Sequence, residues 1–241
     1  MMKMKALIVA AGKGERINKN TEEILPKPLY WCGDKYLIEY VIGNLSQASI
    51  KEFFIVVGFM KKHIVAALGD GARYGVSIKY VENDEYEKAN GLSVYKAKNV
   101  LNEPFLLSMS DHVFQKKTVI DFVTFVKGKN NNYLCTDKKV LMMRDIEDAT
   151  KVLEKEGKIV SIGKKLIQYN SIDCGLFHLT PQFFDALKTS QERGDFSISG
   201  GVKVLAAKNK MFTFDVGEGM WFDVDTKEEL CFLESKFKQI L

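Results

Sequence analysis

The fold of this chain is most constrained by a short apolar run near its N-terminus that stops abruptly at two glycines. Residues 6–10 (Ala-Leu-Ile-Val-Ala) carry no charge, and the stretch Ala-Gly-Lys-Gly-Glu-Arg follows at 11–16. Small and β-branched residues bounded by glycine are typical of a buried strand in a parallel sheet. Ligands bind just past the carboxyl ends of such strands, so the loop after residue 10 is the first place to expect a site.

That loop has the chemistry of an anion-binding site. Gly12 and Gly14 lack a Cβ atom, so their backbone N–H groups can approach an anion closely. Lys13, Arg16 and Lys27 place three cations on the same stretch. The dinucleotide fingerprint G-x-G-x-x-G lacks its third glycine here, and no Walker pattern ending in G-K-[ST] occurs in the chain. We therefore predict that the loop holds a nucleoside triphosphate.

Composition narrows the class of protein. The 241 residues are 46% hydrophobic and 27% charged, which is enough apolar material for a sizeable core. The net charge of +4 comes from scattered residues, so we expect no nucleic-acid binding. No apolar window approaches the ~20 residues of a membrane span, and the N-terminal run is no signal peptide, so we expect a soluble cytoplasmic protein. The four cysteines lie far apart without a C-x-x-C pair, which argues against zinc, and we expect them in the core.

Hydrophobic periodicity predicts alternating strands and helices in the first half of the chain. Such alternation is the mark of a doubly wound sheet. The expected strands are 6–10, 53–58, 77–81 and 105–110, and the expected helices are 37–45, 61–68, a segment beginning at 92, and 118–127.

The pattern changes after residue 127, where strands follow one another with few helices between them. We expect this second, partly antiparallel region to form the other wall of a pocket. Its expected strands are 133–136, 139–144, 158–162, 171–179, 211–216 and 221–224, and its expected helices are 181–187, 198–206 and 226–239.

Three aspartates are candidate ligands for a divalent cation. Asp111 follows the expected central strand, at the end where a carboxylate would face a bound triphosphate. Asp223 and Asp225 alternate just before the last helix, so period-two geometry places them on one side of a strand. Mg²⁺ binds one or two carboxylates together with substrate phosphates. We predict that Asp111 binds Mg²⁺ with Asp223 or Asp225, slightly favouring Asp223; the alternative is that Asp225 or Thr226 caps the helix. His112 is next to Asp111 in the sequence, and this position fits a packed core histidine as well as it fits a neighbour of the metal.

Two lysines are candidates for contact with phosphate. Lys27 lies between Pro26 and Pro28, whose fixed φ angles stiffen its backbone and suit a cation that meets a transferring phosphate. Lys164 follows Gly163 after a strand of the second region, opposite the triphosphate loop. We predict that Lys164 receives the phosphate of an acceptor.

Taken together, these motifs resemble the sugar-phosphate nucleotidyltransferase superfamily along nearly the whole chain. The stretches that carry this resemblance are 10–16, 25–29, 90–93, 109–112 and 221–226. Further stretches resemble the CTP:inositol-1-phosphate cytidylyltransferases, which make CDP-inositol for the compatible solute di-myo-inositol phosphate. These are 90–98, 110–113, 162–164 and 169–175, with Cys174 standing where related chains commonly have threonine.

The resemblance implies transfer of CMP from CTP to inositol 1-phosphate, with Mg²⁺ as the cofactor. It implies a Rossmann-like, GT-A-like α/β fold with a mixed, mostly parallel sheet flanked by helices and a smaller β-rich acceptor-binding lobe. We expect one domain over 1–241, with a nucleotide-binding half at 1–127 and an acceptor-binding half at 128–241.

The resemblance also assigns roles to individual residues. The catalytic residues would be Arg16, Lys27, Asp111 and Lys164. The nucleotide would be bound by Ala10, Gly12, Lys13, Gly14, Lys27, Asn90, Gly91 and Ser93, with Gly91 admitting the base and ribose. The acceptor would be bound by Lys164, Asn170 and Asp173, and the metal by Asp111, Asp223 and Asp225.

Other readings of the same motifs stay open at this point. Phosphocholine cytidylyltransferases and sugar-1-phosphate uridylyl- or thymidylyltransferases share most of them. A non-catalytic nucleotide-binding regulatory subunit is an alternative of a different class, although such a chain would be expected to lose its carboxylates or its loop lysine.

Many similar enzymes are fused to a membrane-embedded synthase that uses CDP-inositol. We expect no membrane insertion of this chain, hence a separate membrane synthase as a partner, and a homodimer is a further expectation.

Overall fold

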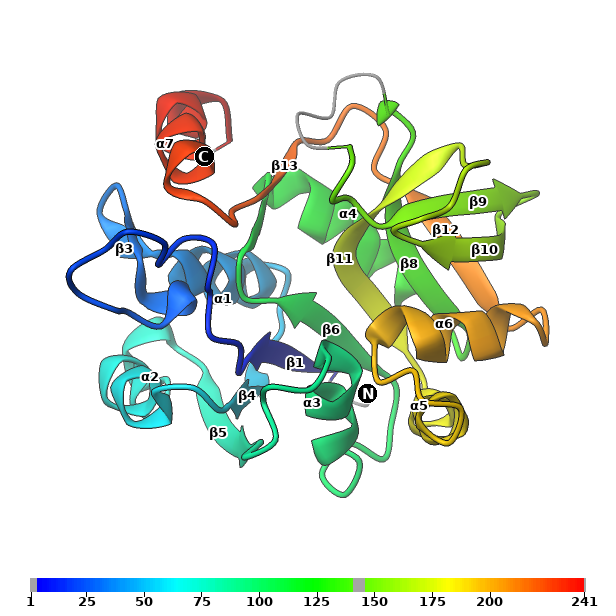
Figure 1. Cartoon of the computed structure of the whole chain (residues 1–241), viewed down its shortest axis with the longest axis horizontal. Helices are drawn as coiled ribbons and strands as arrows, with labels where there is room; N and C mark the ends of the chain where they lie inside the picture. The colour runs from blue at the N-terminus through cyan, green and yellow to red at the C-terminus, as the bar shows by residue number, and fades with distance from the viewer. Residues whose placement is uncertain (1–3, 141–145, 241) are drawn as a thin grey trace.

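One mixed sheet runs through the computed structural model, which describes residues 4–140 and 146–240 (Figure 1). In these residues it has nine strands. From one edge to the other they are β5 (Ser77–Glu82), β4 (Glu52–Val57), β1 (Lys5–Ala10), β6 (Phe105–Met109), β11 (Ser171–Leu179), β8 (Asn132–Asp137), β12 (Met211–Asp215), β10 (Lys158–Gly163) and β9 (Lys151–Lys155).

Strand direction changes in the middle of this sheet. Strands β5, β4, β1 and β6 are parallel, whereas β11 runs antiparallel to both β6 and β8. Leu179 of β11 pairs with Phe105 at the start of β6, and Leu176 pairs with Ser108 near its end. The first residues of β11 therefore lie beyond the carboxyl end of β6, beside Asp111. The mixed sheet predicted from the sequence is confirmed, with the antiparallel strands in the second half of the chain.

The alternating side chains of β1 explain why helices cover both faces of the sheet. Ala6, Ile8 and Ala10 pack on one face with α1 (Leu37–Gln47), α2 (Lys61–Leu68) and α4 (Lys116–Val126). Leu7 and Val9 pack on the other face with α3 (Asn90–Lys96), α5 (Gln182–Gln191) and α6 (Ile198–Ala206). A strand buried on both sides has no polar face, which is why residues 6–10 read as a continuous apolar run.

A smaller apolar cluster packs the last helix against the first half of the chain, and it includes Cys32, Leu37 and Leu233. Helix α7 (Lys227–Ile240) lies next to the hairpin of β2 (Trp31–Cys32) and β3 (Lys35–Tyr36) (Figure 1). Just before it, β13 (Trp221–Asp223) pairs antiparallel with β7 (His112–Phe114). In this register Asp223 lies opposite His112. The short β7–β13 pair therefore brings residues about 110 positions apart to the same point.

Most predicted elements occur at the expected positions, but the region after β8 differs. The strand expected at 139–144 is wrong at 139 and 140, which are not in a strand, and 141–144 lie outside the described residues. Strand β9 was not predicted, because its sequence Lys-Val-Leu-Glu-Lys has charges at three of five positions. It forms through a tight hairpin with β10, in which Glu156 and Gly157 both have positive φ. Such a two-residue turn matches the twist of the paired strands.

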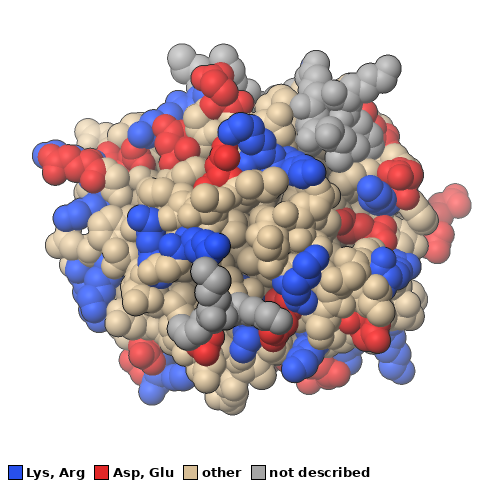
Figure 2. Space-filling view, turned by 180° about the vertical axis from the view of Figure 1, so that it is seen from behind, with Lys and Arg blue, Asp and Glu red and all other residues tan. Residues whose placement is uncertain are grey.

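The structure also bears on the expectations about nucleic-acid binding, membrane insertion and the burial of the cysteines. Acidic and basic residues are interspersed over the face turned away from the view of Figure 1 (Figure 2). In residues 4–140 and 146–240, no helix combines the length and apolar character needed to cross a bilayer. Three of the four cysteines are buried as expected, but Cys231 on α7 is exposed.

Candidate active site

The loop after β1 is shaped by its second glycine and by an asparagine. Gly14 has φ +61°, and a Cβ atom there would lie 2.7 Å from the Cβ atom of Lys27, so only glycine lets the loop close over this lysine. The side-chain amide of Asn18 donates to the carbonyls of Lys13, Gly14 and Leu25 at 2.9–3.2 Å. At Gly12 a Cβ atom would meet nothing within 4 Å, so the space beside this residue is open.

Two cavities meet over the carboxyl ends of β1 and β6. One, of about 480 Å³, is bordered by the loop after β1 and by residues 86–93. The other, of about 410 Å³, is bordered by the second half of the chain and the segment before α7. The residues that line both are Arg16, Asn90, Met109, Asp111 and Asp225. A ligand in each cavity would therefore meet the other beside Asp111.

A buried lysine lies at this junction. Lys27 opens the short 3₁₀ helix η1 (Lys27–Leu29) and is 7% exposed. Its Nζ is 2.6 Å from Asp111 Oδ2 and donates to Asp225 Oδ1. Burial alone would lower the pKa of Lys27, but the surrounding aspartates raise it above its usual range. Burial would likewise raise the pKa of Asp111, but Lys27 and His112 hold it far below its usual range. Both groups are therefore charged at neutral pH.

His112 joins two of the predicted metal ligands. Its Nδ1 is 2.8 Å from Asp111 Oδ1 and 3.5 Å from Asp223 Oδ1. Burial lowers the pKa of His112, but the charges of Asp223 and Asp111 outweigh it and bring the pKa to about 9. Burial raises the pKa of Asp223 to about 7, with Asp111 and Asp225 adding to the rise and His112 opposing it. His112 is therefore part of the charged cluster and not an uncharged core residue.

The same cluster has a donor set that fits a divalent cation. Asp111, His112 and Asp223 each offer one ligand atom, and these atoms lie within 4.8 Å of one another. Within the described chain, the buried Asp223 Oδ1 has no hydrogen-bond partner. Two carboxylates beside a histidine suit Mg²⁺, which takes its other ligands from phosphate and water.

Asp225 has a different environment from Asp223. The alternative role predicted for Asp225 or Thr226 was to cap the last helix, and Thr226 makes this cap. Its Oγ1 accepts from the Glu229 N–H at 3.2 Å. Glu229 Oε2 in return accepts from the backbone N–H groups of Asp225 and Thr226 at 2.7 and 2.8 Å. This capping box leaves the Asp225 carboxylate free to pair with Lys27 and Arg16.

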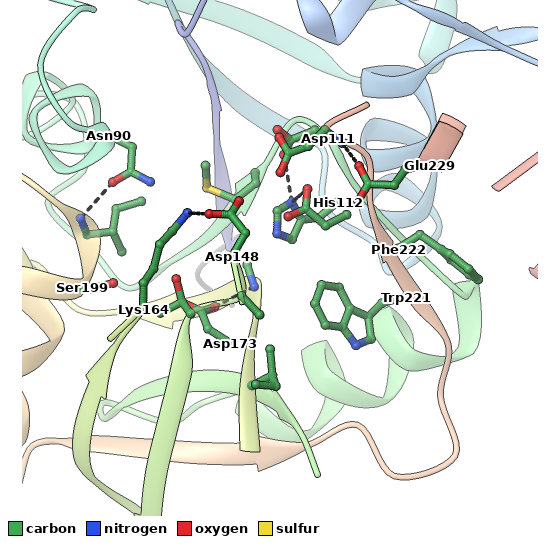
Figure 3. Close-up of a pocket in the computed structure, with 18 of the residues that line it drawn as sticks. Asn90, Asp111, His112, Asp148, Lys164, Asp173, Ser199, Trp221, Phe222 and Glu229 are labelled. Carbon is green, nitrogen blue, oxygen red and sulfur yellow. Dashed lines mark hydrogen bonds and ion pairs between the residues drawn. The ribbon is translucent and has the colours of Figure 1, made fainter. Parts of the chain in front are cut away.

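A chain of alternating charges continues toward the second half of the protein. Arg16, which pairs with Asp225, also pairs with Asp148. Lys164 Nζ is 2.6 Å from the other oxygen of Asp148, and a dashed line marks this ion pair in Figure 3. The predicted triphosphate cation and the predicted acceptor cation are thus held by one carboxylate. Lys13 is paired in a similar way, 2.6 Å from Glu87.

Asp173 lies in the wall of the second cavity, near His112 (Figure 3). Its Oδ1 accepts from the Gly175 N–H at 2.7 Å. Gly175 has φ +74°, and a Cβ atom there would lie 2.8 Å from His112 Nε2, so glycine is required for the ring to pack at this point. Burial raises the pKa of Asp173 to about 6, although the Gly175 N–H and the His112 charge lower it.

Two predicted binding residues have other environments. Gly91 does not line either cavity; a Cβ atom there would lie 2.6 Å from the backbone of Phe196 and Ser197. The glycine therefore permits close packing of α3 against the start of α6, and its expected role in admitting the nucleotide stays a prediction. The side chain of Asn170 donates to and accepts from the backbone of Glu154, both at 2.9 Å, and Asn170 does not line either cavity. Its expected contact with the acceptor is not supported by this placement.

The remaining predicted residues border the cavities. Asn90 lines both, and its Oδ1 accepts from the Ile198 N–H at 3.0 Å. Ser93 lines the first and accepts from the Asn83 amide at 2.9 Å. Ala10 lines the same cavity at the end of β1.

Sequence reasoning missed Asp148 and Glu87. Both are acidic residues in polar stretches, where most carboxylates are solvated surface groups. The only available signal was charge balance: a cluster of cations in a folded protein needs nearby anions when no ligand is bound.

Comparisons with known proteins extend over nearly the whole chain. The family described as Nucleotidyl transferase matches residues 5–239. The chain is 33% identical over 227 residues to a bifunctional IPC transferase and DIPP synthase of Archaeoglobus fulgidus, which covers 94% of this chain and 42% of that protein. It is 32% identical over 233 residues to a protein of the same name from Thermococcus kodakarensis, covering 95% of this chain and 50% of that one. This chain thus spans about half the length of these relatives.

A solved structure matches the whole fold. The inositol-1-phosphate CTP transferase from T. maritima superimposes with a TM-score of 0.83 at 26% identity. The match covers 99% of this chain and 98% of that one. Both lobes of the sheet therefore have counterparts in that protein.

Proposed function

The chain belongs to the nucleotidyl transferase family, and from this premise we propose that it is a cytidylyltransferase that transfers CMP from CTP to inositol 1-phosphate. The products are CDP-inositol and pyrophosphate. The names of the two curated relatives and of the matching solved structure support this acceptor and this nucleotide. The chain retains Lys27 and all three aspartates, which supports an enzyme over a non-catalytic binding subunit.

The observation that carries the proposal is the junction of two cavities at Asp111. The reaction joins two polyanions, so the enzyme must hold both and neutralise the charge between them. We assign the cavity beside Gly12 and Gly14 to CTP, and the cavity beside Lys164 and Asp173 to inositol 1-phosphate. In this arrangement the acceptor phosphate approaches the α-phosphorus of CTP beside Asp111.

The reaction itself is an in-line displacement. A phosphate oxygen of the acceptor forms a bond to the α-phosphorus, and the bond from this phosphorus to the β-phosphate bridging oxygen breaks, releasing pyrophosphate. Lys27 and Arg16 stabilise the negative charge on the triphosphate, and Lys164 holds the acceptor phosphate. The Asp173 carboxylate accepts hydrogen bonds from inositol hydroxyls. The protein contributes alignment and electrostatics and forms no covalent bond to substrate.

Mg²⁺ is the proposed cofactor, held by Asp111 and Asp223. When bound, it would neutralise charge on the phosphate oxygens of CTP. Asp225 keeps Lys27 and Arg16 in place in the free protein and is a further candidate ligand once phosphates engage those cations. We also propose a cytoplasmic location, a role in supplying CDP-inositol to a membrane synthase activity that makes a compatible solute, and a homodimeric assembly.

Pyrophosphate release is the direct test of this proposal. It should be measured over a grid of CTP, UTP and dTTP against inositol 1-phosphate, phosphocholine and glucose 1-phosphate, with and without Mg²⁺. We expect CTP with inositol 1-phosphate to give the highest kcat/KM. A higher value for any other pair would assign that substrate instead, and no release from any pair would support a non-catalytic binding protein.

Replacing Asp111 by Asn should lower kcat at least 100-fold, because a carboxylate at the reacting centre is lost while its shape is kept. The matched control is Asp121→Asn on α4, where the exposed carboxylate pairs with Lys117 at 2.5 Å. The control should keep full activity. Turnover of Asp111→Asn at the control's rate would show that the metal and charge assignment is wrong.

A further inference from the structure

A buried lysine lies behind the wall of the second cavity. Lys151 is the first residue of β9 and is 8% exposed, but it does not line the cavity itself. Its Nζ donates to the Lys164 carbonyl at 2.8 Å and to the Glu147 carbonyl at 3.2 Å. The Tyr169 ring centroid is 5.8 Å away. Across 4–140 and 146–240, no carboxylate is paired with this ammonium group.

Lys151 occupies the place where three wall segments converge. In the sheet it pairs with Gly163 of β10 on one side and with Ile172 of β11 on the other. The residue before it, Thr150, accepts a hydrogen bond at 2.9 Å from the backbone N–H of Asp173. The loops that carry Asp148 and Lys164 and the start of β11, which carries Asp173, are therefore all attached at this point.

The two hydrogen bonds of Lys151 connect the loop of Asp148 to the loop of Lys164. The ion pair between Asp148 and Lys164 connects the same two loops at the cavity. Lys151 donates to the backbone carbonyl of Lys164, while the Lys164 Nζ pairs with Asp148 in the lining of the cavity. When a phosphate binds Lys164, this ion pair competes with it and can be lost. The hydrogen bonds of Lys151 use backbone carbonyls only, so substrate does not compete for them.

The charge of Lys151 also bears on an anion in the cavity. A buried ammonium is unfavourable unless it is hydrogen-bonded, and here its partners are neutral carbonyls and an aromatic face. Its positive charge is therefore not cancelled by a carboxylate among the described residues. In a low-dielectric wall such a charge acts on a nearby phosphate more strongly than an exposed lysine would.

We infer that Lys151 is a positioning residue for the acceptor phosphate. It clamps the loop ending at Thr150 to the loop that begins at Gly163, and it places Lys164 at the mouth of the second cavity. This inference rests on the proposed function, since it assigns the second cavity to a phosphate-bearing acceptor. Lys151 acts through Lys164, through the loop backbone and through its own charge in the wall, and it does not touch the substrate.

The test compares Lys151→Met, Lys151→Arg and the control Lys155→Met, which removes an exposed lysine from the same strand. Pyrophosphate release is measured with varied acceptor at saturating CTP, and with varied CTP at saturating acceptor. We expect Lys151→Met to raise the KM for acceptor at least tenfold while the KM for CTP changes less than threefold. Lys151→Arg keeps donors and charge and should stay within threefold of the unmodified protein, as should the control.

A purely structural role would give a different result. Equal changes in both KM values, or a loss of thermal stability with no change in the acceptor KM, would overturn the inference. If Lys151→Met does not fold, Lys151→Gln enters the same comparison, because it keeps one donor and removes the charge.

Failure of the proposed function is recognised separately from failure of this inference. If the unmodified protein uses another acceptor, the comparison is made with that acceptor. If it turns over none, the dissociation constant of inorganic phosphate is measured by calorimetry for the unmodified protein, Lys151→Met and the control. Weaker phosphate binding by Lys151→Met alone would support the positioning role, and equal binding by all three would refute it.

Discussion

The Asp173 carboxylate gives a prediction in which stability and function move in opposite directions. Asp173 is partly buried and accepts one backbone hydrogen bond, from Gly175. Asparagine has nearly the same shape, and its Oδ1 can keep that bond. Asp173→Asn therefore removes the negative charge and leaves the packing nearly unchanged. We expect a more stable protein that binds the acceptor less well.

The size and sign of the effect follow from the raised pKa of Asp173. Burial raises this pKa from 3.8 to about 6, so the folded state disfavours the ionised carboxylate relative to the unfolded state. At about 1.36 kcal/mol per pKa unit, the penalty is about 3 kcal/mol when the group is fully ionised. The penalty is complete above pH 7, falls to roughly 1.5 kcal/mol at pH 5, and vanishes below pH 3.8. His112, with a pKa of about 9, stays protonated throughout this range.

Urea unfolding of both proteins at pH 8, 7, 6 and 5, without added divalent cations, measures this difference directly. The free energy of unfolding of Asp173→Asn should exceed that of the unmodified protein by up to 3 kcal/mol at pH 8, with the excess halved at pH 5. The KM for acceptor should rise at least tenfold. A difference in stability that does not depend on pH, or that grows as pH falls, would refute the reasoning.

Two further predictions follow from contacts in the site and behind it. Asp148→Asn should lower the dissociation constant of CTP, measured by calorimetry, three- to tenfold, because Arg16, which pairs with Asp148, loses an anion that competes with the triphosphate; weaker binding would mean that Asp148 contacts substrate. Gly91→Ala should lower the free energy of unfolding by about 1–3 kcal/mol, because its Cβ atom would lie 2.6 Å from the Ser197 backbone. In the control Gly43→Ala on α1, the Cβ atom meets nothing, and we expect a gain of about 0.5–1 kcal/mol in denaturant unfolding; equal effects of the two changes would contradict the packing argument.

Several contacts of the predicted site residues could not be predicted from the sequence. Gly91 and Asn170 have residue types that suit ligands, and each also contacts the backbone of another segment. Asp148 was passed over because nothing in its neighbourhood distinguishes it from a surface carboxylate. Residue type and spacing describe what a side chain can do. They do not describe which segment will lie against it.

The sequence by itself determined the features that depend on local patterns. An uncharged apolar strand that ends at glycines must be covered on both faces, so residues 6–16 alone predict a layered α/β fold with a ligand loop at the end of its first strand. The position of Asp111 follows from the same rule, since it ends the neighbouring central strand.

Tertiary structure alone decided how these parts form one site. Because β11 runs antiparallel to β6, its first residues carry Asp173 to the side of Asp111, and the pairing of β7 with β13 does the same for Asp223. The different environments of Asp223 and Asp225 depend on the cap made by Glu229, and Arg16 and Lys164 are linked because each pairs with Asp148. The Glu229 cap is local, but Asp111 and Asp173 are 62 positions apart, His112 and Asp223 are 111 apart, and Arg16 and Asp148 are 132 apart. Periodicity within one segment carries no information about such pairings, because they are set by how the segments pack.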